Sequence, residues 1–573
     1  MKIETLLFEE IVIFSELFLG ISIIYLVMHC TFLAIKKKYP LIQTSVLYLS
    51  VLALLFSVYL VFNEPLSVLE SSCLNNSFAT DYVGFFSKLV VGSLSIFCLL
   101  MMQSYILAQK INNFEYFLLI LFSVLGLFLL CSSNDFLTAY LAIELQSLSF
   151  YVLAAFKKNS TFSVSAGIKY FILGAFASSL FLFGSSLLYG LTGTICFEDF
   201  NMLFMDVLPG GITASEKDSL IEVCAEILRH DMIGTEQDIL NLCASMELPL
   251  SEAVIATTYF ESYVLQALAC LKAQDLINHG GIAAEISNVN LIKFALVFIL
   301  VGLFFKLTAA PFHLWAPDVY EGSPSSSTFF FSVVPKLAIF VVLLRIFYFS
   351  FYGFVDSWRY FIVLVVVFSI IVGSFGGVEQ RKLKTLLVYS TISHMGYSLI
   401  AFSAGTFESL QMLMSYLVVY SFSGLCVWSI FLATRLKNNY FQKQNKDLTD
   451  LVLLGKSNYM LAIFFTTVLF SVAGFPPMIG FLVKMGIFVT AIESSMYFVA
   501  LISILCSVVG TFYYIRLIKI LYFEKVLVGK LYYPINFQSS ILITALFFLL
   551  IFLFVNPTLL FLLSYKVSLL LLT

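Results

Sequence analysis

Fourteen long apolar runs dominate this sequence and decide what kind of fold it can form. A helix needs about 20 apolar residues to cross the hydrocarbon core of a bilayer, and each run has about that length or more. Only 11% of the 573 residues are charged, less than half of the about 25% usual in soluble proteins, which excludes a water-soluble globular protein. The sequence predicts an all-α polytopic membrane protein with about 14 transmembrane helices. The runs cover 11–35, 41–62, 83–108, 115–132, 134–156, 165–191, 289–318, 325–350, 358–377, 384–404, 409–434, 458–493, 496–522 and 538–565.

Two of these runs are too long for one straight helix and contain proline. The seventh includes FKLTAAPFHLWAP (Phe305 to Pro317), and the twelfth includes SVAGFPPMIGFLVK (Ser471 to Lys484). Proline removes a backbone donor and collides with the preceding turn. Lipid tolerates the freed backbone groups only where protein or a cavity surrounds them. Because interrupted helices at matching places in two halves of a chain indicate an inverted-repeat transporter, we expect two inverted repeats with broken helices 7 and 12.

Basic residues in the loops give the chain an orientation. They follow odd-numbered spans, so all of these loops lie on one side of the membrane. The positive-inside rule makes that side the cytoplasm or the matrix. Both termini and the loops after even-numbered spans then face outward. The basic clusters lie at 36–38, 157–158, 381–384, 435–446 and 516–530.

One polar stretch, residues 195–290, differs from the rest of the chain. It holds 15 acidic and 3 basic residues, a formal charge of −12, whereas the remainder holds 19 acidic and 28 basic residues, a charge of +9. Its apolar periodicity predicts three amphipathic helices, which bury too small a core to be stable alone. We expect it to dock on a protein partner on the outer side and to take no part in proton transfer. A disordered insertion is the alternative.

These features divide the chain into six parts. No pattern for binding nucleic acid appears in any of them, and the ten cysteines show no metal-ligand spacing. The parts are 1–110 (helices 1–3), 111–194 (helices 4–6 of the first repeat), 195–290 (the acidic insert), 291–350 (helices 7–8, which complete the first repeat), 351–530 (helices 9–13, the second repeat) and 531–573 (the C-terminal helix 14).

Four ionisable residues lie deep within apolar spans, where a charge costs about 2.5–3.5 kcal/mol. Glu144 lies in LAIELQSLSFYVLAA and Lys336 in FFFSVVPKLAIFVVLL, whereas Lys306 precedes the first break and Lys484 follows the second. Lysine can release its proton on burial and regain it beside a carboxylate, but arginine stays charged. A row of such groups across the midplane predicts a proton relay with intervening waters. Structural salt bridges between helices are the alternative.

Other ionisable residues lie nearer to the ends of spans or beside a break. His313 follows the first break directly. Lys169 and His394 lie near the starts of spans 6 and 10, where a functional role and a side chain that reaches the interface are equally open. For Glu16 and Lys88, which also lie near span ends, a side chain that snorkels to the interface is the simpler interpretation.

Five segments resemble antiporter-like subunit 2, or subunit N, of respiratory complex I, the NADH–ubiquinone oxidoreductase. Within them, IELQSLSFY and HLWAPDVYEG distinguish subunit 2 from its paralogues, subunits 4 and 5. The resemblance covers nearly the whole chain except 195–290, where this family usually has a short loop. The segments are AIELQSLSFYVLAA (142–155), AGIKYFILGAFASSLFLFGSSLLYG (166–190), FKLTAAPFHLWAPDVYEGSPSS (305–326), LLVYSTISHMGY (386–397) and AGFPPMIGFLVKMGIF (473–488).

The resemblance implies a role for each matched ionisable residue. Glu144 and Lys306 match the pair that switches protonation, and we expect them to lie within hydrogen-bonding or one-water distance of each other. Lys336 matches the lysine that connects the two half-channels, and Lys484 matches the lysine of broken helix 12 on the exit side. The supporting positions are Lys169, which matches a lysine that modulates the pair, His313, which matches a histidine beside the connecting lysine, and His394.

The resemblance also implies what the chain does and what it works with. It implies a proton-translocating subunit in the membrane arm of complex I, driven by quinone reduction elsewhere in the complex. No cofactor is expected on this chain, since other subunits use the NADH, FMN, iron–sulfur clusters and ubiquinone. The implied partners are antiporter-like subunit 4, the small membrane subunits, accessory subunits at 195–290, and lipid. The alternatives are a subunit of a multisubunit cation/proton antiporter and a structural spacer that pumps nothing.

Composition favours one compartment for this chain. It has 62 Phe and 30 Tyr but only 3 Trp, and 25 Lys against 6 Arg. This bias fits an AT-rich organellar genome. We therefore expect a multi-pass protein of the mitochondrial inner membrane, with a bacterial inner membrane or a plastid thylakoid as the alternatives.

Overall fold

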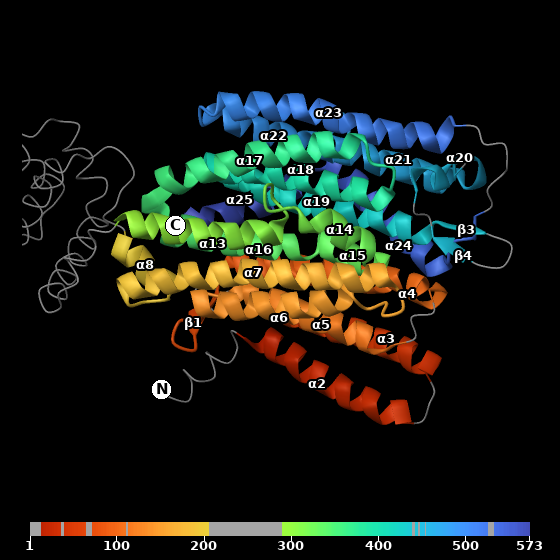
Figure 1. The fold of residues 1–573 in the computed structure, drawn as a ribbon, viewed down its shortest axis with the longest axis horizontal. Helices are drawn as coiled ribbons and strands as arrows, with labels where there is room; N and C mark the ends of the chain where they lie inside the picture. The colour runs from red at the N-terminus through yellow and green to blue at the C-terminus, as the bar shows by residue number, and fades with distance from the viewer. Residues whose placement is uncertain are drawn as a thin grey trace, which may run out of the picture.

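The computed structural model describes most of the chain as a bundle of long helices that run side by side along one direction (Figure 1). Two short antiparallel hairpins lie at opposite ends of this bundle: β1–β2 (Ser71–Cys73 with Phe78–Thr80) and β3–β4 (Arg435–Lys437 with Gln442–Gln444). The residues that the structure describes are 13–35, 39–64, 71–109, 113–204, 289–437, 442–444, 447–452, 454–524 and 532–572.

The first six predicted spans are helices in the structure. Local signals set their bounds, as α7 shows: the Ser160 side chain accepts a hydrogen bond from the backbone N–H of Ser163 at its start, and Gly193 ends it with a left-handed φ of 77°. A short helix, α8 (Phe197–Phe204), follows. The six are α2 (Phe14–Ile35), α3 (Tyr39–Phe62), α4 (Tyr82–Ala108), α5 (Glu115–Ser132), α6 (Phe136–Ala154) and α7 (Thr161–Thr192).

The second half of the chain contains the remaining spans and several short helical pieces. Its longer helices are α13 (Val289–Leu307), α17 (Val355–Val378), α18 (Leu383–Ala404), α19 (Phe407–Ala433), α21 (Tyr459–Ala473), α22 (Ile479–Glu493), α23 (Tyr497–Tyr522), α24 (Phe537–Val555) and α25 (Thr558–Leu572). The short pieces are α14 (Trp315–Gly322), α15 (Ser325–Val333), α16 (Pro335–Leu344), the π-helical turn η3 (Arg345–Ser350), the 3-10 turns η4 (Tyr352–Phe354) and η5 (Leu448–Leu451), and α20 (Leu454–Ser457).

The number of spans agrees with the sequence. Within the described ranges, 12 helical segments are long and apolar enough to cross a membrane. Two further segments, α18, which is rich in serine and threonine, and the broken pair α21 and α22, bring the number to the fourteen predicted. The prediction of an all-α polytopic membrane protein is confirmed.

One span forms the axis of the bundle. The segment Ser325–Ser350, which contains α15, α16 and η3, is 100% buried inside the chain, whereas the apolar stretches of α2 and α24 are only 28% buried. A helix that other protein surrounds on all sides can hold polar groups that lipid would not solvate. The centre of the bundle can therefore hold ionisable side chains.

Both predicted breaks are present. The first separates α13, which ends at Leu307, from α14; the second separates α21 from α22, with Gly474 at a left-handed φ of 86°. Side chains that follow each break satisfy freed carbonyls. The indole N–H of Trp315 donates to the carbonyl of Phe305 at 3.1 Å, and the Lys484 amine donates to the last carbonyls of α21.

The segment predicted as the C-terminal helix 14 is interrupted in the structure. The segment consists of α24 and α25, which are separated at Asn556 and Pro557. Proline has no N–H to continue the ladder of α24, and its fixed φ suits the start of a new helix. Both pieces pack along α19, so the chain still completes one crossing.

The two ends of the bundle can be told apart. The start of α2 and the end of α25 lie at one end, which we call the outer end, and β3–β4 lies at the other, the inner end (Figure 1). This agrees with termini that share one side and with basic residues such as Arg435 on the opposite side. Most of the acidic insert, 205–288, lies outside the described residues, and so do the three helices predicted for it.

Candidate functional site

Lys336 lies at the centre of the axial span. Its side chain belongs to the first turn of α16 and is only 2% exposed. The amine donates a hydrogen bond of 2.8 Å to the hydroxyl of Tyr420 on α19 and lies 4.8 Å from the centroid of that ring. Among the described residues, no carboxylate lies within 4.0 Å of this amine. Lys336 is thus a buried amine held by a phenol.

His394 continues this polar group on α18. Its imidazole, in a residue only 4% exposed, lies 5.2 Å from the Tyr420 ring, centroid to centroid. Its Nδ1 is 2.6 Å from the hydroxyl of Tyr416, and its Nε2 is 3.3 Å from the hydroxyl of Tyr514 on α23. Imidazole can donate through one nitrogen while it accepts through the other. His394 therefore joins hydroxyls that come from two helices on either side of it.

Lys484 occupies the second break. Its amine donates to the carbonyls of Val472 at 2.8 Å and Ala473 at 3.0 Å, and it lies 5.2 Å from the centroid of the Tyr397 ring. The residue is 8% exposed. Because the break frees these carbonyls from the ladder of α21, they can accept from the lysine. The charge is thus held by backbone dipoles and an aromatic face.

Glu144 and Lys306 lie near each other but do not form a direct ion pair. The charge of Glu144 acts on Lys306, yet no contact within 4.0 Å joins them among the ion pairs of the described residues. One carboxylate oxygen of Glu144 and the amine of Lys306 are buried without a hydrogen-bond partner in the described part of the chain. The predicted direct hydrogen bond is absent, and the one-water arrangement stays a prediction.

Tyr151 lies beside this first pair. The Lys306 amine is 5.8 Å from the centroid of its ring, and Ser147, one turn before it, is 3.3 Å from the other carboxylate oxygen of Glu144. Each of the three deep lysines thus lies over a tyrosine ring, an arrangement that stabilises a cation when water is scarce. Together we call Glu144, Lys306, Lys336, His394 and Lys484 the central row.

The structure separates the supporting positions. His394 joins the central row, whereas Lys169 does not: its side chain is 57% exposed on α7 and pairs with Asp318 of α14 at 2.6 Å. His313 lies in the first break, with its Nδ1 buried and without a hydrogen-bond partner among the described residues. Its place beside Lys336 stays a prediction.

The interpretation of Glu16 and Lys88 as snorkelling residues is wrong. Both side chains are only 2% exposed, and they form an ion pair of 2.6 Å between α2 and α4. Hydroxyls of Ser15 and Ser132 donate to the two oxygens of Glu16. A paired carboxylate and amine tolerate burial where a single charge would not, so these residues point into the bundle rather than to its surface.

The sequence did not identify the tyrosines. The chain has 30 of them, too many for composition to single out Tyr420 or Tyr416. A positional signal existed for two others: Tyr151 lies seven residues after Glu144, and Tyr397 lies three residues after His394, so each shares a helix face with an ionisable residue. In the described part of the chain, no group of three or more His, Cys, Asp or Glu could hold a metal ion.

Comparison with known proteins places this geometry in a family. Residues 133–223 and 252–510 match the family described as NADH:quinone oxidoreductase/Mrp antiporter, TM. The chain is 34% identical over 564 residues to NADH-ubiquinone oxidoreductase chain 2 of Marchantia polymorpha, covering 98% of both chains. It is 33% identical over 513 residues to NADH-quinone oxidoreductase subunit N of Pelagibacter ubique, covering 90% of this chain and 89% of the relative.

Solved structures share the fold at lower identity. A chain of respiratory complex I from Thermus thermophilus matches with a TM-score of 0.67 at 22% identity, covering 96% of this chain and 98% of that one. A chain of the Mrp complex from Dietzia matches with a TM-score of 0.70 at 16% identity, covering 99% and 98%. The chain therefore belongs to the NADH:quinone oxidoreductase/Mrp antiporter family and, within it, to the chain 2 or subunit N group of NADH–quinone oxidoreductase.

Proposed function

We propose that this chain, as a subunit of NADH–quinone oxidoreductase, moves protons across the membrane along the central row. The observation that carries the proposal is that Lys306, Lys336 and Lys484 lie deep in the bundle without a carboxylate within 4.0 Å among the described residues. Structural salt bridges would have paired them, as Glu16 and Lys88 are paired. Unpaired buried amines can change their protonation state, which is what a relay requires.

The route follows from the contacts. Glu144 and Lys306 form the first station, Lys336 with Tyr420 the second, His394 with its two hydroxyl partners the third, and Lys484 the last. Lys336 with Tyr420 and His394 with its two partners already share hydrogen bonds, and we propose that waters bridge the remaining steps. Quinone reduction in other subunits supplies the driving force, and we propose that this chain itself holds no redox centre.

Two alternative functions remain distinguishable from this one. A structural spacer has no use for four ionisable residues in the bundle centre, each kept at a cost in stability. A multisubunit cation/proton antiporter shares the fold, but the relatives over nearly the whole chain are named as oxidoreductase subunits. The partners we propose are antiporter-like subunit 4, the small membrane subunits and, at 195–290, accessory subunits.

The setting of the complex follows from the relatives. Those named as NADH-ubiquinone oxidoreductase chain 2 come from plants, and those named as subunit N of the quinone enzyme come from bacteria. A multi-pass protein of an energy-conserving inner membrane agrees with both groups. The excess of lysine over arginine favours the mitochondrial inner membrane.

Ion selectivity in the complete complex tests the proposed function. Vesicles that contain the assembled complex, supplied with NADH and a quinone, are expected to acidify their interior with no NADH-dependent movement of radioactive sodium. Sodium transport coupled to NADH oxidation would instead favour the antiporter. The same chain should migrate with the other subunits of the oxidoreductase in a native gel, and migration in an antiporter complex would contradict the assignment.

Replacement of Tyr420 by Phe tests the second station. The variant keeps the ring beneath Lys336 but removes the hydroxyl that accepts its hydrogen bond, so the amine loses its proton contact and keeps its packing. We expect pumping to fall by about tenfold with assembly unchanged, because a hydrogen bond to a charged group contributes about 1.5–3 kcal/mol and about 1.4 kcal/mol is tenfold in rate. Tyr189, which is 55% exposed on α7, gives the matched control, and Tyr189→Phe should pump at the normal rate. Equal rates in both variants would remove Tyr420 from the route.

A further inference from the structure

A second group of ionisable side chains lies at the outer end of the bundle, apart from the central row. Its core is the ion pair between Glu16 and Lys88. The Lys88 amine lies 2.6 Å from a carboxylate oxygen of Glu16, and each side chain is 2% exposed. The hydroxyls of Ser15 and Ser132 donate to Glu16 at 2.6 Å and 3.1 Å. A pair this well satisfied usually has only a structural role. A third member of the group indicates a role beyond a structural one.

Glu64, which follows the end of α3, is that third member. One of its carboxylate oxygens is buried and has no hydrogen-bond partner among the described residues, and the charges of Lys88 and Glu16 both act on it. One lysine cannot neutralise two buried carboxylates. One proton is therefore needed to make the group neutral, and burial favours the protonated form of Glu64.

Electrostatics place the titration of Glu64 close to neutral pH. Burial raises the pKa of its carboxyl to about 7; Lys88 opposes this rise and Glu16 adds to it. Because the folded chain keeps this proton to a higher pH than the unfolded chain does, its contribution to stability is present below about 4.5 and is lost as the pH rises through about 7. The other groups that face the site are Cys131 of α5, whose thiol lies near Lys88, and, beyond it, Arg345 of η3.

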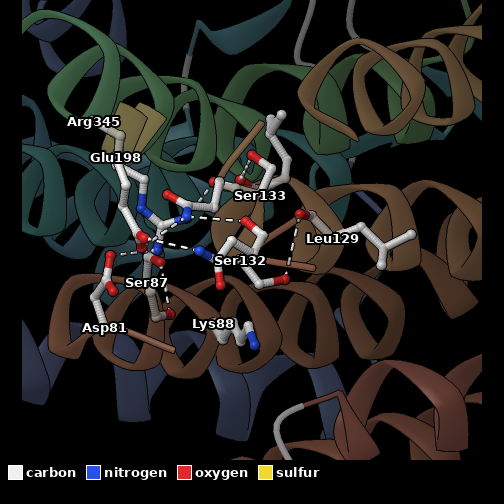
Figure 2. Close-up of polar contacts among 12 residues, drawn as sticks. Asp81, Ser87, Lys88, Leu129, Ser132, Ser133, Glu198 and Arg345 are labelled. Atoms are coloured by element: carbon white, nitrogen blue, oxygen red, sulfur yellow. Dashed lines mark hydrogen bonds and ion pairs between the residues drawn. The ribbon is translucent and has the colours of Figure 1, made fainter. Parts of the chain in front are cut away.

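The axial span runs from the central row toward this group. α16 carries Lys336, and Arg345 follows nine residues later, about 14 Å along the helix axis. Arg345 begins a π-helical turn, a feature that often marks functional sites. Its guanidinium donates to the carbonyl of Ser133 at 2.6 Å and pairs with Asp81 at 2.9 Å. Figure 2 shows Arg345 between these two residues, with Ser132 and Lys88 beside them.

Polar atoms therefore continue from the axial span to the buried group. The carbonyl of Ser133 accepts from Arg345. The preceding residue, Ser132, is the last of α5, and its hydroxyl donates to Glu16. Gly84 on α4 keeps the space open, since a Cβ there would approach the Arg345 guanidinium and the carbonyl of Cys131, both at 3.0 Å. Glu64 itself lies just outside the apolar span of α3, which ends at Phe62.

We propose that Glu16, Lys88 and Glu64 form a proton-release site on a branch from the central row, through which a proton that leaves at Lys336, before it reaches Lys484, passes to the outer aqueous phase. This inference rests on the proposed function. Glu64 holds the proton at the water-facing end of the site, and the ion pair keeps it there until the next proton arrives. The site belongs to the helices α2, α3 and α4, which carry no member of the central row.

Replacement of Glu64 by Gln in the complete complex is the test. Infrared spectra of the wild-type complex across pH 5 to 9 should contain a protonated carboxyl that disappears with a midpoint near pH 7, and the variant should lack it. NADH-driven pumping should fall by about 100-fold, the lower end of what a positioned acid or base contributes. Glu408, exposed at the start of α19 at the same end of the bundle, gives the matched control. Glu408→Gln should retain both the infrared signal and the pumping rate.

Two outcomes would overturn the inference: identical infrared titrations of wild type and Glu64→Gln, or an unchanged pumping rate in that variant. If the variant does not assemble, the double variant Glu16→Gln with Lys88→Met gives the reading, because it removes the two charges of the ion pair together. It should slow pumping to a similar degree, and normal pumping would refute the site. A Lys306→Met complex separates the two proposals: if it pumps normally, the proposed function fails, and if it alone stops pumping, only the release site fails.

Discussion

Replacement of Lys306 by Met is expected to give a complex that assembles normally but hardly pumps. Methionine has a similar length and packs well in an apolar bundle, so the first break should keep its shape. It cannot accept a proton from Glu144, whose carboxylate would lose the one amine that its charge acts on among the described residues. We expect coupled NADH oxidation to fall by about 100-fold, the lower range of what a positioned acid or base contributes. The rate is measured in sealed vesicles after a native gel has shown assembly.

Lys158 provides the matched control for this variant. It is an exposed lysine in the loop between α6 and α7, so Lys158→Met removes one positive charge without touching the central row. Its rate should equal that of the wild type. Normal coupled turnover in an assembled Lys306→Met complex would favour the structural spacer.

Replacement of Gly480 by Ala is expected to have the largest effect on stability. A Cβ at this position would lie 1.9 Å from the backbone carbonyl oxygen of Ser471, so α21 and α22 would have to move apart. The cost should lie at or above the upper end of the about 1–3 kcal/mol typical of overpacking, because backbone rather than a flexible side chain blocks the space. Lys484, one turn later on α22, would lose its carbonyl partners. We expect little assembled complex, measured as the native-gel yield and its thermal midpoint.

Gly190 provides a matched glycine. It also lies within a helix, α7, but a Cβ there would meet nothing within 4 Å. Alanine is favoured over glycine by about 1 kcal/mol in a helix interior, so Gly190→Ala should assemble at least as well as the wild type. Equal yields for the two glycine variants would show that the second break is not held by the close approach of its two helices.

The helices and breaks of this fold were predictable from local physics. Apolar runs have the length of the bilayer core, and prolines such as Pro311 and Pro477 mark where a helix cannot continue. The same rule applies at Pro557, which separates α24 from α25. The residues of the central row were found because a charge within an apolar run is costly and therefore conspicuous.

The arrangement around those charges was not predictable, because it depends on which helices meet. Tyr420 is one of 30 tyrosines, and only the packing of α19 against α16 places it on Lys336. Depth along a span also does not show which face a side chain takes. Lys88 and Lys169 lie at similar depths, yet the first is buried in an ion pair and the second is exposed. The position of a residue in the sequence indicates its depth in the membrane, whereas tertiary packing decides which way its side chain points.

The number of protons translocated per electron tests the central claim most directly. It compares pumping with electron transfer in the same vesicles, so it does not depend on how fast a variant turns over. In Lys336→Met complexes, which lose the amine at the centre of the axial span, we predict that the residual NADH oxidation translocates fewer protons per electron than the wild type does. An unchanged ratio would mean that no proton crosses the membrane through this chain.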